Sequence, residues 1–466
     1  RRGPRSGSCV DSGLTEPGPR TPLPMWPLRR GCVLRWLGPR SCRRTTVLVA
    51  FLWFALWALL NSLLFMHRTI FSDFCTDDRS KRILQRLCGE YQQGILTGDL
   101  CEDLCVNRML EYKRCLYYEK GKKVMEAKWH GMPVVLKSKL ENFSSYEGFG
   151  PLEYQDASEL SSMDVVFYAT LEIKNSLGLE VRNATGPRLW SQELHQRSQP
   201  YSRAEIASLW ALLQQEEYIF FKALQDFSQH VVKVLGSCGH FYAVEHLVAG
   251  HAWNQNLFSL EDLLGPPDEV VDGWVGGHGH KAERDMVNRI ALSFLDMVSH
   301  FENDFSHHLH LCDIKPENFA IRKDLTVVAI DVDMAFFEPK MQDILEQNCT
   351  HDDDCNFFDC VSKCDLKRNK CGSKRVNSNL QVICDKIFRR WFSPTLLGAG
   401  AELPLQVELQ HAVQECVETA SGEDTERSGA IWRRLLSVLT QLLEDGSAQK
   451  TGRGDTQGHP HSALNF

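Results

Sequence analysis

The stretch that decides the fold is "HLHLCDIKPENFAI", residues 308–321. Asp313 is followed two residues later by Lys315 and five residues later by Asn318. This spacing is typical of a phosphotransferase catalytic loop, in which a carboxylate orients the attacking hydroxyl, a lysine neutralises the phosphate and an amide oxygen binds a metal ion. Cys312 stands directly before Asp313, where protein kinases usually have Arg. The loop therefore predicts either a working catalytic base or the remnant of one.

Upstream of this loop, the chain offers further parts of such a site in the order of a bilobal protein kinase. A hairpin with its turn at His130–Gly131 leads to "PVVLK", which puts Lys137 where kinases have their phosphate-binding lysine. A buried lysine needs an acidic partner. Residues 202–225 predict one long helix, and Glu217 within it is the candidate partner, with Glu216 the next best.

Downstream, Asp331 lies 13 residues after Asn318, the interval expected for the metal-binding Asp of the D-F-G triplet. Asp333, in the same "DVD", is the alternative, and we prefer Asp331 on spacing. Carboxylate and amide oxygens on adjacent loops suit Mg²⁺ or Mn²⁺ that bridges the phosphates of ATP. We therefore predict ATP with Mg²⁺ or Mn²⁺ as the cofactor, with Asn318 and Asp331 as metal ligands.

Three features depart from the usual kinase pattern. The glycine-rich loop that covers the phosphates is reduced to "GKKV", in which Gly121 is the single glycine. Without an Arg before the catalytic Asp, the usual pairing with a phosphorylated activation loop cannot form. The segment after "DVD" is rich in cysteine and shows no A-P-E triplet, so we expect disulfides to fix its shape.

Residues 45–66, "TTVLVAFLWFALWALLNSLLFM", are 22 residues without a charge, long enough to span the roughly 30 Å hydrocarbon layer of a membrane. A cleaved signal peptide is the alternative, but the apolar run exceeds the usual length and no A-x-A-like site follows it. The heavier Arg load precedes the segment, which places that side in the cytoplasm. We predict a single-pass signal anchor with the main domain lumenal or extracellular.

Charge and cysteine content agree with this topology. Residues 1–44 carry ten Arg and two acidic residues, a net charge of +8. Because the net charge of the whole chain is −8, the remaining residues carry a net charge of −16. An acidic body argues against nucleic acid as the principal partner. Fourteen of the 17 cysteines follow the apolar segment, which favours disulfides over a zinc site for Cys101 and Cys105. Three glycosylation sequons lie on the same side, at Asn142, Asn183 and Asn348.

Six stretches of the chain together resemble the divergent protein kinase domain 1 family. They are "GDLCEDLC", "PVVLKSK", "LWALLQQEEY", "VLGSCGHFYAVE", "LHLCDIKPENFAI" and "AIDVDMAFFEPKM". The resemblance spans roughly residues 70–440 and implies a kinase-like fold in a type II membrane protein of the endoplasmic reticulum. Some family members carry an EF-hand-like calcium loop before the "LWALL" helix. This chain has no D-x-D-x-D-G run there, so we expect no calcium site.

We therefore predict an α+β, bilobal protein-kinase-like fold, lumenal, behind a single N-terminal transmembrane helix. The expected segments are an Arg-rich cytoplasmic tail (1–44), the transmembrane anchor (45–66), a lumenal cysteine-rich segment (67–116), an N-lobe with an insertion (117–250), a C-lobe with a cysteine-rich activation segment (251–445) and a disordered tail (446–466).

The predicted function is transfer of phosphate from ATP to a Ser or Thr hydroxyl of a secretory-pathway protein, or to a glycan hydroxyl. Asp313 and Lys315 are the candidate catalytic residues, and the candidate nucleotide-binding residues are Lys137, Glu217 and Gly121. The alternative is a weak or inactive pseudokinase that serves as a binding scaffold, because the glycine loop, the Arg before the catalytic Asp and the D-F-G triplet are all altered.

Overall fold

The computed structural model describes residues 39–71, 75–151, 161–179, 200–252, 257–260, 279–393, 404–418 and 425–451. The chain separates into two compact units, Arg1–Ser72 and Asp73–Phe466, and each is described by itself. Three predicted segments lie outside the described residues, at least in part: most of the cytoplasmic tail, the residues directly before Pro200 where no calcium loop is expected, and the end of the C-terminal tail.

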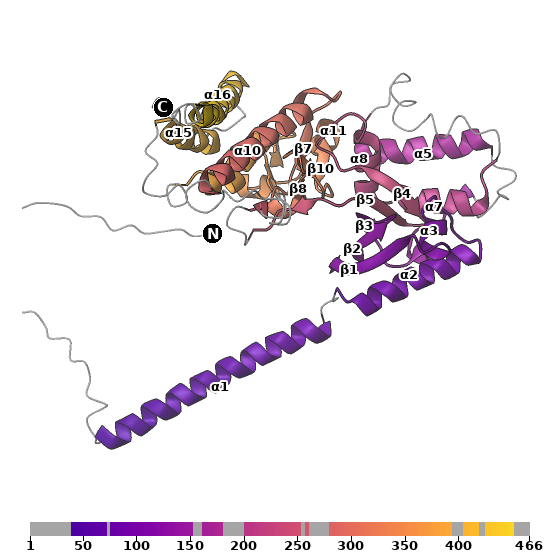
Figure 1. Ribbon diagram of the computed structural model, residues 1–466, viewed down its shortest axis with the longest axis horizontal. Coiled ribbons are helices and arrows are strands. Elements are labelled where there is room, and N and C mark those ends of the chain that lie inside the picture. Colours follow the sequence, from indigo (N-terminus) through magenta and orange to yellow (C-terminus); the bar gives the residue numbers. More distant parts are fainter. Residues whose placement is uncertain are drawn as a thin grey trace, which may run out of the picture. The chain divides into compact units, whose positions relative to one another are not determined.

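The first unit contains helix α1 (Pro39–Phe71), which includes the whole apolar segment 45–66 (Figure 1). Large apolar side chains between Val47 and Leu63 are exposed. In the part of the chain that the structure describes, no helix combines the length and the apolar character that a membrane crossing requires. The single-pass anchor therefore stays a prediction.

The N-lobe of the second unit contains a five-stranded antiparallel sheet in the order β1-β2-β3-β5-β4. Its strands are β1 (Leu110–Glu119), β2 (Lys122–Trp129), β3 (Met132–Ser138), β4 (Val234–Cys238) and β5 (Phe241–Glu245). Two-residue turns join the first three strands, at Lys120–Gly121 and at His130–Gly131, and all four turn residues have positive φ. Such turns match the twist of the paired strands. The hairpin predicted at His130–Gly131 is confirmed.

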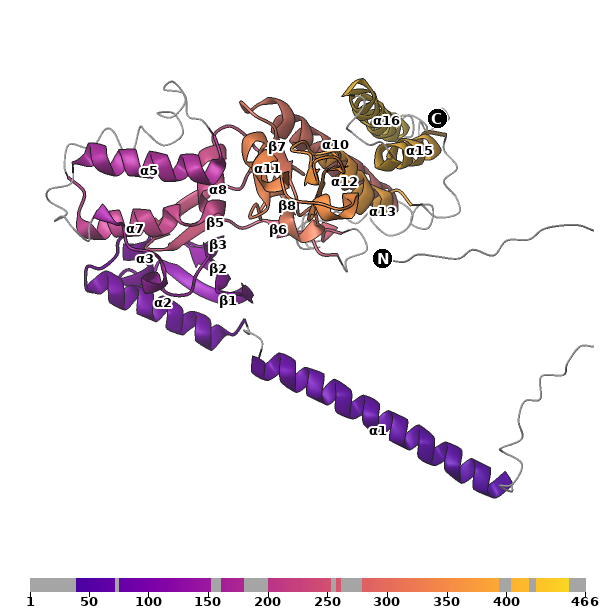
Figure 2. The same cartoon turned by 180° about the vertical axis from the view of Figure 1, so that it is seen from behind.

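Helices cover both faces of this sheet (Figures 1 and 2). On one face, α2 (Asp77–Gln92) and α3 (Cys101–Cys105) bury apolar side chains such as Leu87 against Met125 and Leu136 of the sheet. On the other face, α8 (Glu216–Leu224) packs with α5 (Ser162–Leu177) against β5. The second face continues into the core of the C-lobe, so α8 lies between the two lobes.

The single long helix predicted over 202–225 is wrong, because the chain breaks after α7 (Arg203–Leu213) and resumes as α8. The break depends on Gln215, whose buried amide nitrogen donates to the carbonyl of Ala211 at 3.1 Å and to that of His240 at 2.8 Å. Its amide oxygen accepts from the backbone of Lys139 at 2.8 Å. These contacts anchor the start of α8 to the sheet and set which residues of α8 point inward.

The C-lobe combines helices with short strand pairs. Its helices are α10 (Gly279–Asn303), α11 (Glu338–Leu345), α12 (Asn379–Ile383), α13 (Arg389–Trp391), α15 (Pro404–Glu418) and α16 (Thr425–Thr451). Its strands are β6 (Val248–Ala249), β7 (Leu309–Leu311), β8 (Phe319–Ile321), β9 (Val327–Ala329), β10 (Ala335–Phe337), β11 (Asn356–Phe357), β12 (Cys360–Val361), β13 (Cys364–Asp365) and β14 (Lys370–Cys371). Short helical turns complete the described elements: η1 (Phe143–Ser145), η3 (Pro316–Asn318), η4 (Asp352–Cys355) and η5 (Cys384–Phe388).

Helix α10 forms the centre of the C-lobe core. The helical spacing of five apolar residues predicts a core stripe: Met286, Ile290, Phe294, Met297 and Phe301. The last four are fully buried and Met286 is half-buried, so the stripe is confirmed except at its first position. The sequence of residues 403–445 also predicts two helices, and these are present as α15 and α16, which pack together and against α10 and η5. Helix α16 runs to Thr451, past the predicted start of the tail.

Seven disulfides pair all fourteen cysteines from Cys75 to Cys416. The pairs are Cys75–Cys115, Cys88–Cys105, Cys101–Cys238, Cys312–Cys360, Cys349–Cys364, Cys355–Cys371 and Cys384–Cys416. The preference for disulfides over a zinc site at Cys101 and Cys105 is therefore confirmed, since each bonds to a different distant cysteine.

Candidate active site

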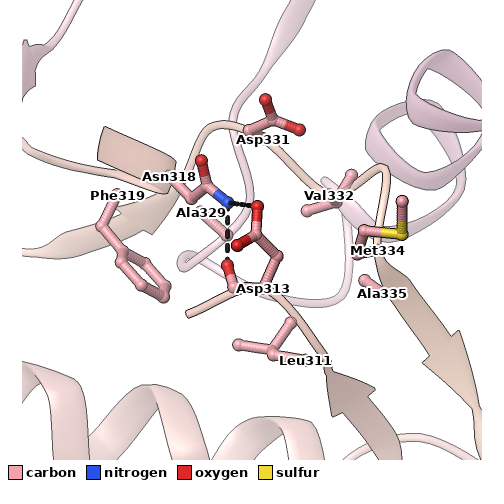
Figure 3. Close-up of a pocket in the computed structure, with 9 residues that line it drawn as sticks. All are labelled: Leu311, Asp313, Asn318, Phe319, Ala329, Asp331, Val332, Met334 and Ala335. Atoms are coloured by element: carbon pink, nitrogen blue, oxygen red, sulfur yellow. Dashed lines mark hydrogen bonds between the residues drawn. The ribbon is translucent and has the colours of Figure 1, made fainter. Parts of the chain in front are cut away.

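The predicted catalytic loop lies between β7 and β8 and lines a small pocket (Figure 3). Asp313 follows β7, and η3 turns the chain back so that Asn318 meets it. The Asn318 amide nitrogen donates to the Asp313 carbonyl at 2.8 Å and to the carboxylate at 3.0 Å. The Lys315 ammonium donates to the same carboxylate oxygen at 2.6 Å. Two donors thus orient the Asp313 carboxylate, while 30% of this side chain stays exposed to a reactant.

Lys137 on β3 and Glu217 on α8 form a buried ion pair, with 2.6 Å between the ammonium nitrogen and a carboxylate oxygen. The Tyr242 hydroxyl donates to the other carboxylate oxygen at 2.6 Å, and Lys137 also donates to the carbonyl of Ile330 at 2.5 Å. Burial raises the pKa of the Glu217 carboxyl, while the ammonium of Lys137 acts against this rise. The pair joins the sheet to α8, the arrangement that kinases need in order to bind nucleotide phosphates. Glu216, the alternative partner, is exposed.

Asp331 and Asp333 lie in the irregular segment that separates β9 from β10. Asp331 lines the pocket together with Asp313 and Asn318. The backbone amide of Ile330 donates to the carbonyl of Asn318 at 2.9 Å, which fixes the spacing of the two loops. Burial would raise the pKa of Asp331, but the neighbouring lysine ammonium groups outweigh burial and lower it. The site therefore holds an ionised carboxylate beside the amide of Asn318.

Lys122, which the interpretation of the sequence overlooked, reaches into the same site from the start of β2. Its ammonium lies 2.7 Å from Asp333, 3.0 Å from Asp331 and 3.7 Å from Glu217. Burial would lower the pKa of Lys122, but these three carboxylates outweigh it and raise the pKa above the usual range. The register of the hairpin indicates this position, because Val124 pairs with Lys137 and successive side chains of a strand point to opposite faces of the sheet. Lys122 therefore shares the sheet face of Lys137.

Gly121, predicted to contact the nucleotide, occupies the β1–β2 turn with φ of +94°. A side chain there would be strained, and its Cβ would lie 3.4 Å from the carbonyl oxygen of Lys139. Gly121 is not among the residues that line the described pocket. Its structural role is to permit the tight turn that precedes Lys122.

The oxygen donors of this site fit a hard divalent cation. Carboxylate oxygens of Glu217, Asp331 and Asp333 lie within 4.8 Å of one another. The amide oxygen of Asn318 points away from Asp313, to the side on which Asp331 lies (Figure 3). Carboxylate and amide oxygens are the ligands that Mg²⁺ and Mn²⁺ prefer. Asp331 and Asn318 are therefore placed to hold such an ion, with Asp333 as a third oxygen donor nearby.

The disulfide Cys312–Cys360 ties the catalytic loop to the cysteine-rich segment that follows the "DVD". Both cysteines are fully buried. Two hydrogen bonds reinforce the tie: the Asp359 amide donates to the Cys312 carbonyl at 2.8 Å, and the Ile314 amide donates to the Asp359 carboxylate at 2.7 Å. Lys386 pairs with the same carboxylate at 2.6 Å. A covalent bond thus stands where most kinases use an Arg to bind a phosphorylated loop.

Gly250 lets β6 approach the catalytic loop closely. A Cβ at Gly250 would lie 2.2 Å from the carbonyl oxygen of Pro316, a clash with backbone. We expect Gly250→Ala to lower the free energy of unfolding by about 1–3 kcal/mol, because the loop must shift. Gly89→Ala in α2 is the matched control, since its Cβ meets nothing within 4 Å and Ala stabilises a helix by about 1 kcal/mol. Denaturant titration of both variants measures this, and equal stability of Gly250→Ala and the wild type would contradict it.

Two family models match this chain. One, described as the protein-kinase domain of FAM69, matches residues 209–419, and the other, described as "N-term cysteine-rich ER, FAM69", matches residues 40–164. Together they cover more than half of the chain. The first match includes Glu217, Asp313, Asn318 and Asp331, and the second includes Lys137. These matches support the resemblance to a divergent kinase family that the sequence motifs suggested.

Proposed function

Because this chain belongs to the FAM69 family of proteins with a kinase-like domain, we propose that it transfers phosphate from ATP to a hydroxyl group of a secretory-pathway protein or glycan. The observation that carries the proposal is the ion pair of Lys137 and Glu217, which Lys122 links to Asp331 in the pocket that Asp313 and Asn318 also line. Among the members of the family, we place the chain closest to member C, on the motifs quoted above.

Each side chain of the site has a task in this proposal. Asp313 accepts the hydrogen of the attacking hydroxyl and orients its oxygen, and Lys315 beside it neutralises the phosphate that is transferred. Lys137, kept in place by Glu217, binds the phosphates of ATP. Asp331 and Asn318 hold Mg²⁺ or Mn²⁺. When bound, the metal nucleotide supplies the phosphoryl group and the positive charge that offsets its oxygens.

We propose that the catalytic domain faces the lumen of the endoplasmic reticulum, behind a type II membrane anchor at residues 45–66. Seven disulfides support an oxidising compartment. Of the predicted glycosylation sites, Asn348 is exposed and Asn142 is half-buried, while Asn183 lies outside the described residues. The Arg-rich side of the apolar segment supports a cytoplasmic N-terminus. We propose neither a calcium site nor a nucleic-acid partner.

A second candidate function is that of a pseudokinase that binds a partner without transferring phosphate. The observation that favours it is the β1–β2 turn, which consists of Lys120 and Gly121 alone and leaves no glycine-rich loop to cover the phosphates. The retained Asp313, Lys315 and Asn318 favour catalysis instead, since these groups serve the transfer step.

The test is transfer of labelled phosphate from ATP by the purified full-length chain, with Mn²⁺ and with Mg²⁺, to itself and to secretory-pathway proteins and glycans. Transfer in either metal supports the phosphotransferase. ATP binding without transfer to any acceptor supports the pseudokinase. Absence of both ATP binding and transfer would exclude the proposed function.

A further inference from the structure

The ammonium of Lys122 lies between the carboxylates of Asp331 and Asp333, in the position where a metal ion is expected. Its side chain is only 18% exposed, and its ammonium is within 3.0 Å of both Asp333 and Asp331. Glu217 lies 3.7 Å from the same ammonium. These three carboxylates are also the group whose oxygens cluster closely enough to bind a metal ion. The ammonium of Lys122 is thus a charge of the protein itself in the position suited to a bound cation.

The charges of this cluster explain why one lysine there matters. The three carboxylates Glu217, Asp331 and Asp333 carry three negative charges, and Lys122 and Lys137 carry two positive ones. Without Lys122 the cluster would keep two negative charges, which one divalent cation neutralises. With Lys122 in place, a metal ion that binds without nucleotide is repelled by the ammonium and must displace it. Metal binding should therefore be weak until a nucleotide offers its phosphates to that ammonium.

The β1–β2 turn gives Lys122 a second task. In kinases, the backbone amides of a long glycine-rich loop cover the phosphates. Here the turn has two residues, Lys120 and Gly121, and Lys122 is already paired with Glu119 in the strand ladder. A side-chain ammonium at the first position of β2 can reach phosphate oxygens where such a short backbone turn cannot. Lysine binds phosphate as a point charge and does not need a precise loop geometry.

We propose that Lys122 is a phosphate-binding residue that replaces the glycine-rich loop and that occupies the cation position between Asp331 and Asp333 in the absence of nucleotide. The proposal has two halves. The phosphate half, that Lys122 binds phosphate, rests on the proposed function. The cation half, that Lys122 occupies the cation position, rests on the carboxylate cluster alone. It makes nucleotide and metal depend on each other: nucleotide draws the ammonium away from the carboxylates, which then become available to the metal.

The experiment compares the full-length wild type with Lys122→Met, which keeps most of the length of the side chain and removes its charge. Titration calorimetry measures Mn²⁺ alone, and then ATP in the presence of Mn²⁺. We expect Lys122→Met to bind Mn²⁺ alone at least about tenfold more tightly and ATP at least about tenfold more weakly. A purely structural role would weaken both, so the opposite signs are the signature.

Two further variants keep the result interpretable. Lys122→Arg retains the charge and should bind Mn²⁺ like the wild type, even if Lys122→Met folds poorly. Lys128→Met, an exposed residue of the same strand, should change neither affinity. Unchanged or weaker binding of Mn²⁺ by Lys122→Met overturns the cation half of the proposal, and unchanged ATP binding overturns the phosphate half. If no variant and no wild type binds ATP, the proposed function fails, while the Mn²⁺ titration still decides the role of Lys122.

Discussion

Asp313→Asn is expected to lower the rate of phosphate transfer by about 10²–10⁴-fold, the usual contribution of a positioned acid or base. The substitution keeps the size of the side chain, but it replaces the carboxylate that accepts the proton of the attacking hydroxyl with a neutral amide. The neighbouring donors of the carboxylate, Lys315 at 2.6 Å and Asn318 at 3.0 Å, can still donate to the amide oxygen. The fold and the affinity for ATP should therefore change little.

The measurement is initial rates of labelled phosphate transfer at saturating ATP, together with the melting temperature of each variant. Asp353→Asn is a matched control, because Asp353 is an exposed carboxylate in the cysteine-rich segment, away from the described pocket. It should transfer phosphate at the rate of the wild type. Wild-type rates in Asp313→Asn would show that another group accepts the hydrogen and would contradict the assignment of the catalytic loop.

Removal of the disulfide Cys312–Cys360 by a double substitution to Ser should lower the free energy of unfolding by about 2–5 kcal/mol. The bond closes a loop of 48 residues and lies in the buried contact between the catalytic loop and the cysteine-rich segment. Loss of the bond raises the conformational entropy of the unfolded chain, and the two Ser residues place hydroxyl groups in an apolar site. Because Cys312 adjoins Asp313, transfer should fall as well.

The control for this prediction is the double substitution of Cys75 and Cys115, which removes a disulfide of comparable span, 40 residues, from the N-lobe. It should also lower stability, but transfer by the folded fraction should remain. Denaturant unfolding gives the stability, and transfer assays well below the melting temperature give the activity. Equal losses of activity in both double variants would show that Cys312–Cys360 has no particular role in positioning the catalytic loop.

The local part of the site could be predicted from the sequence because it is encoded within a few residues. Asp313, Lys315 and Asn318 lie on one tight loop, so their spacing alone fixes their geometry. The pairing of Lys137 with Glu217 was harder to predict, because 80 residues separate the two and the adjacent Glu216 was the next-best candidate. What decides it is the break at Gln215, which orients α8 so that Glu217 is buried. The single long helix predicted over residues 202–225 has no such break, so it does not show which of the two glutamates points inward.

Other features depend on contacts between distant parts of the chain. The cysteine count predicts disulfides but not which cysteines pair, because the pairs depend on how strands and loops meet. Lys122 was overlooked because the expected kinase loop draws attention to glycines, whereas the strand register already placed Lys122 on the face of Lys137. The apolar stretch "LTVVAIDVDMAFF" predicts one strand, but an irregular segment that contains Asp331 separates β9 from β10. This segment places Asp331 at the pocket.

The proposed function requires that ATP with a divalent cation binds between Lys137 and Asp331. The most direct test is the melting temperature of the purified full-length chain with ATP, in Mn²⁺ and in Mg²⁺, beside Lys137→Met. We expect ATP with metal to raise the melting temperature of the wild type, because a ligand that binds the folded state stabilises it, by about 2.7 kcal/mol at a hundredfold excess over Kd. Lys137→Met should show little or no rise. An unchanged melting temperature of the wild type in both metals would contradict the claim.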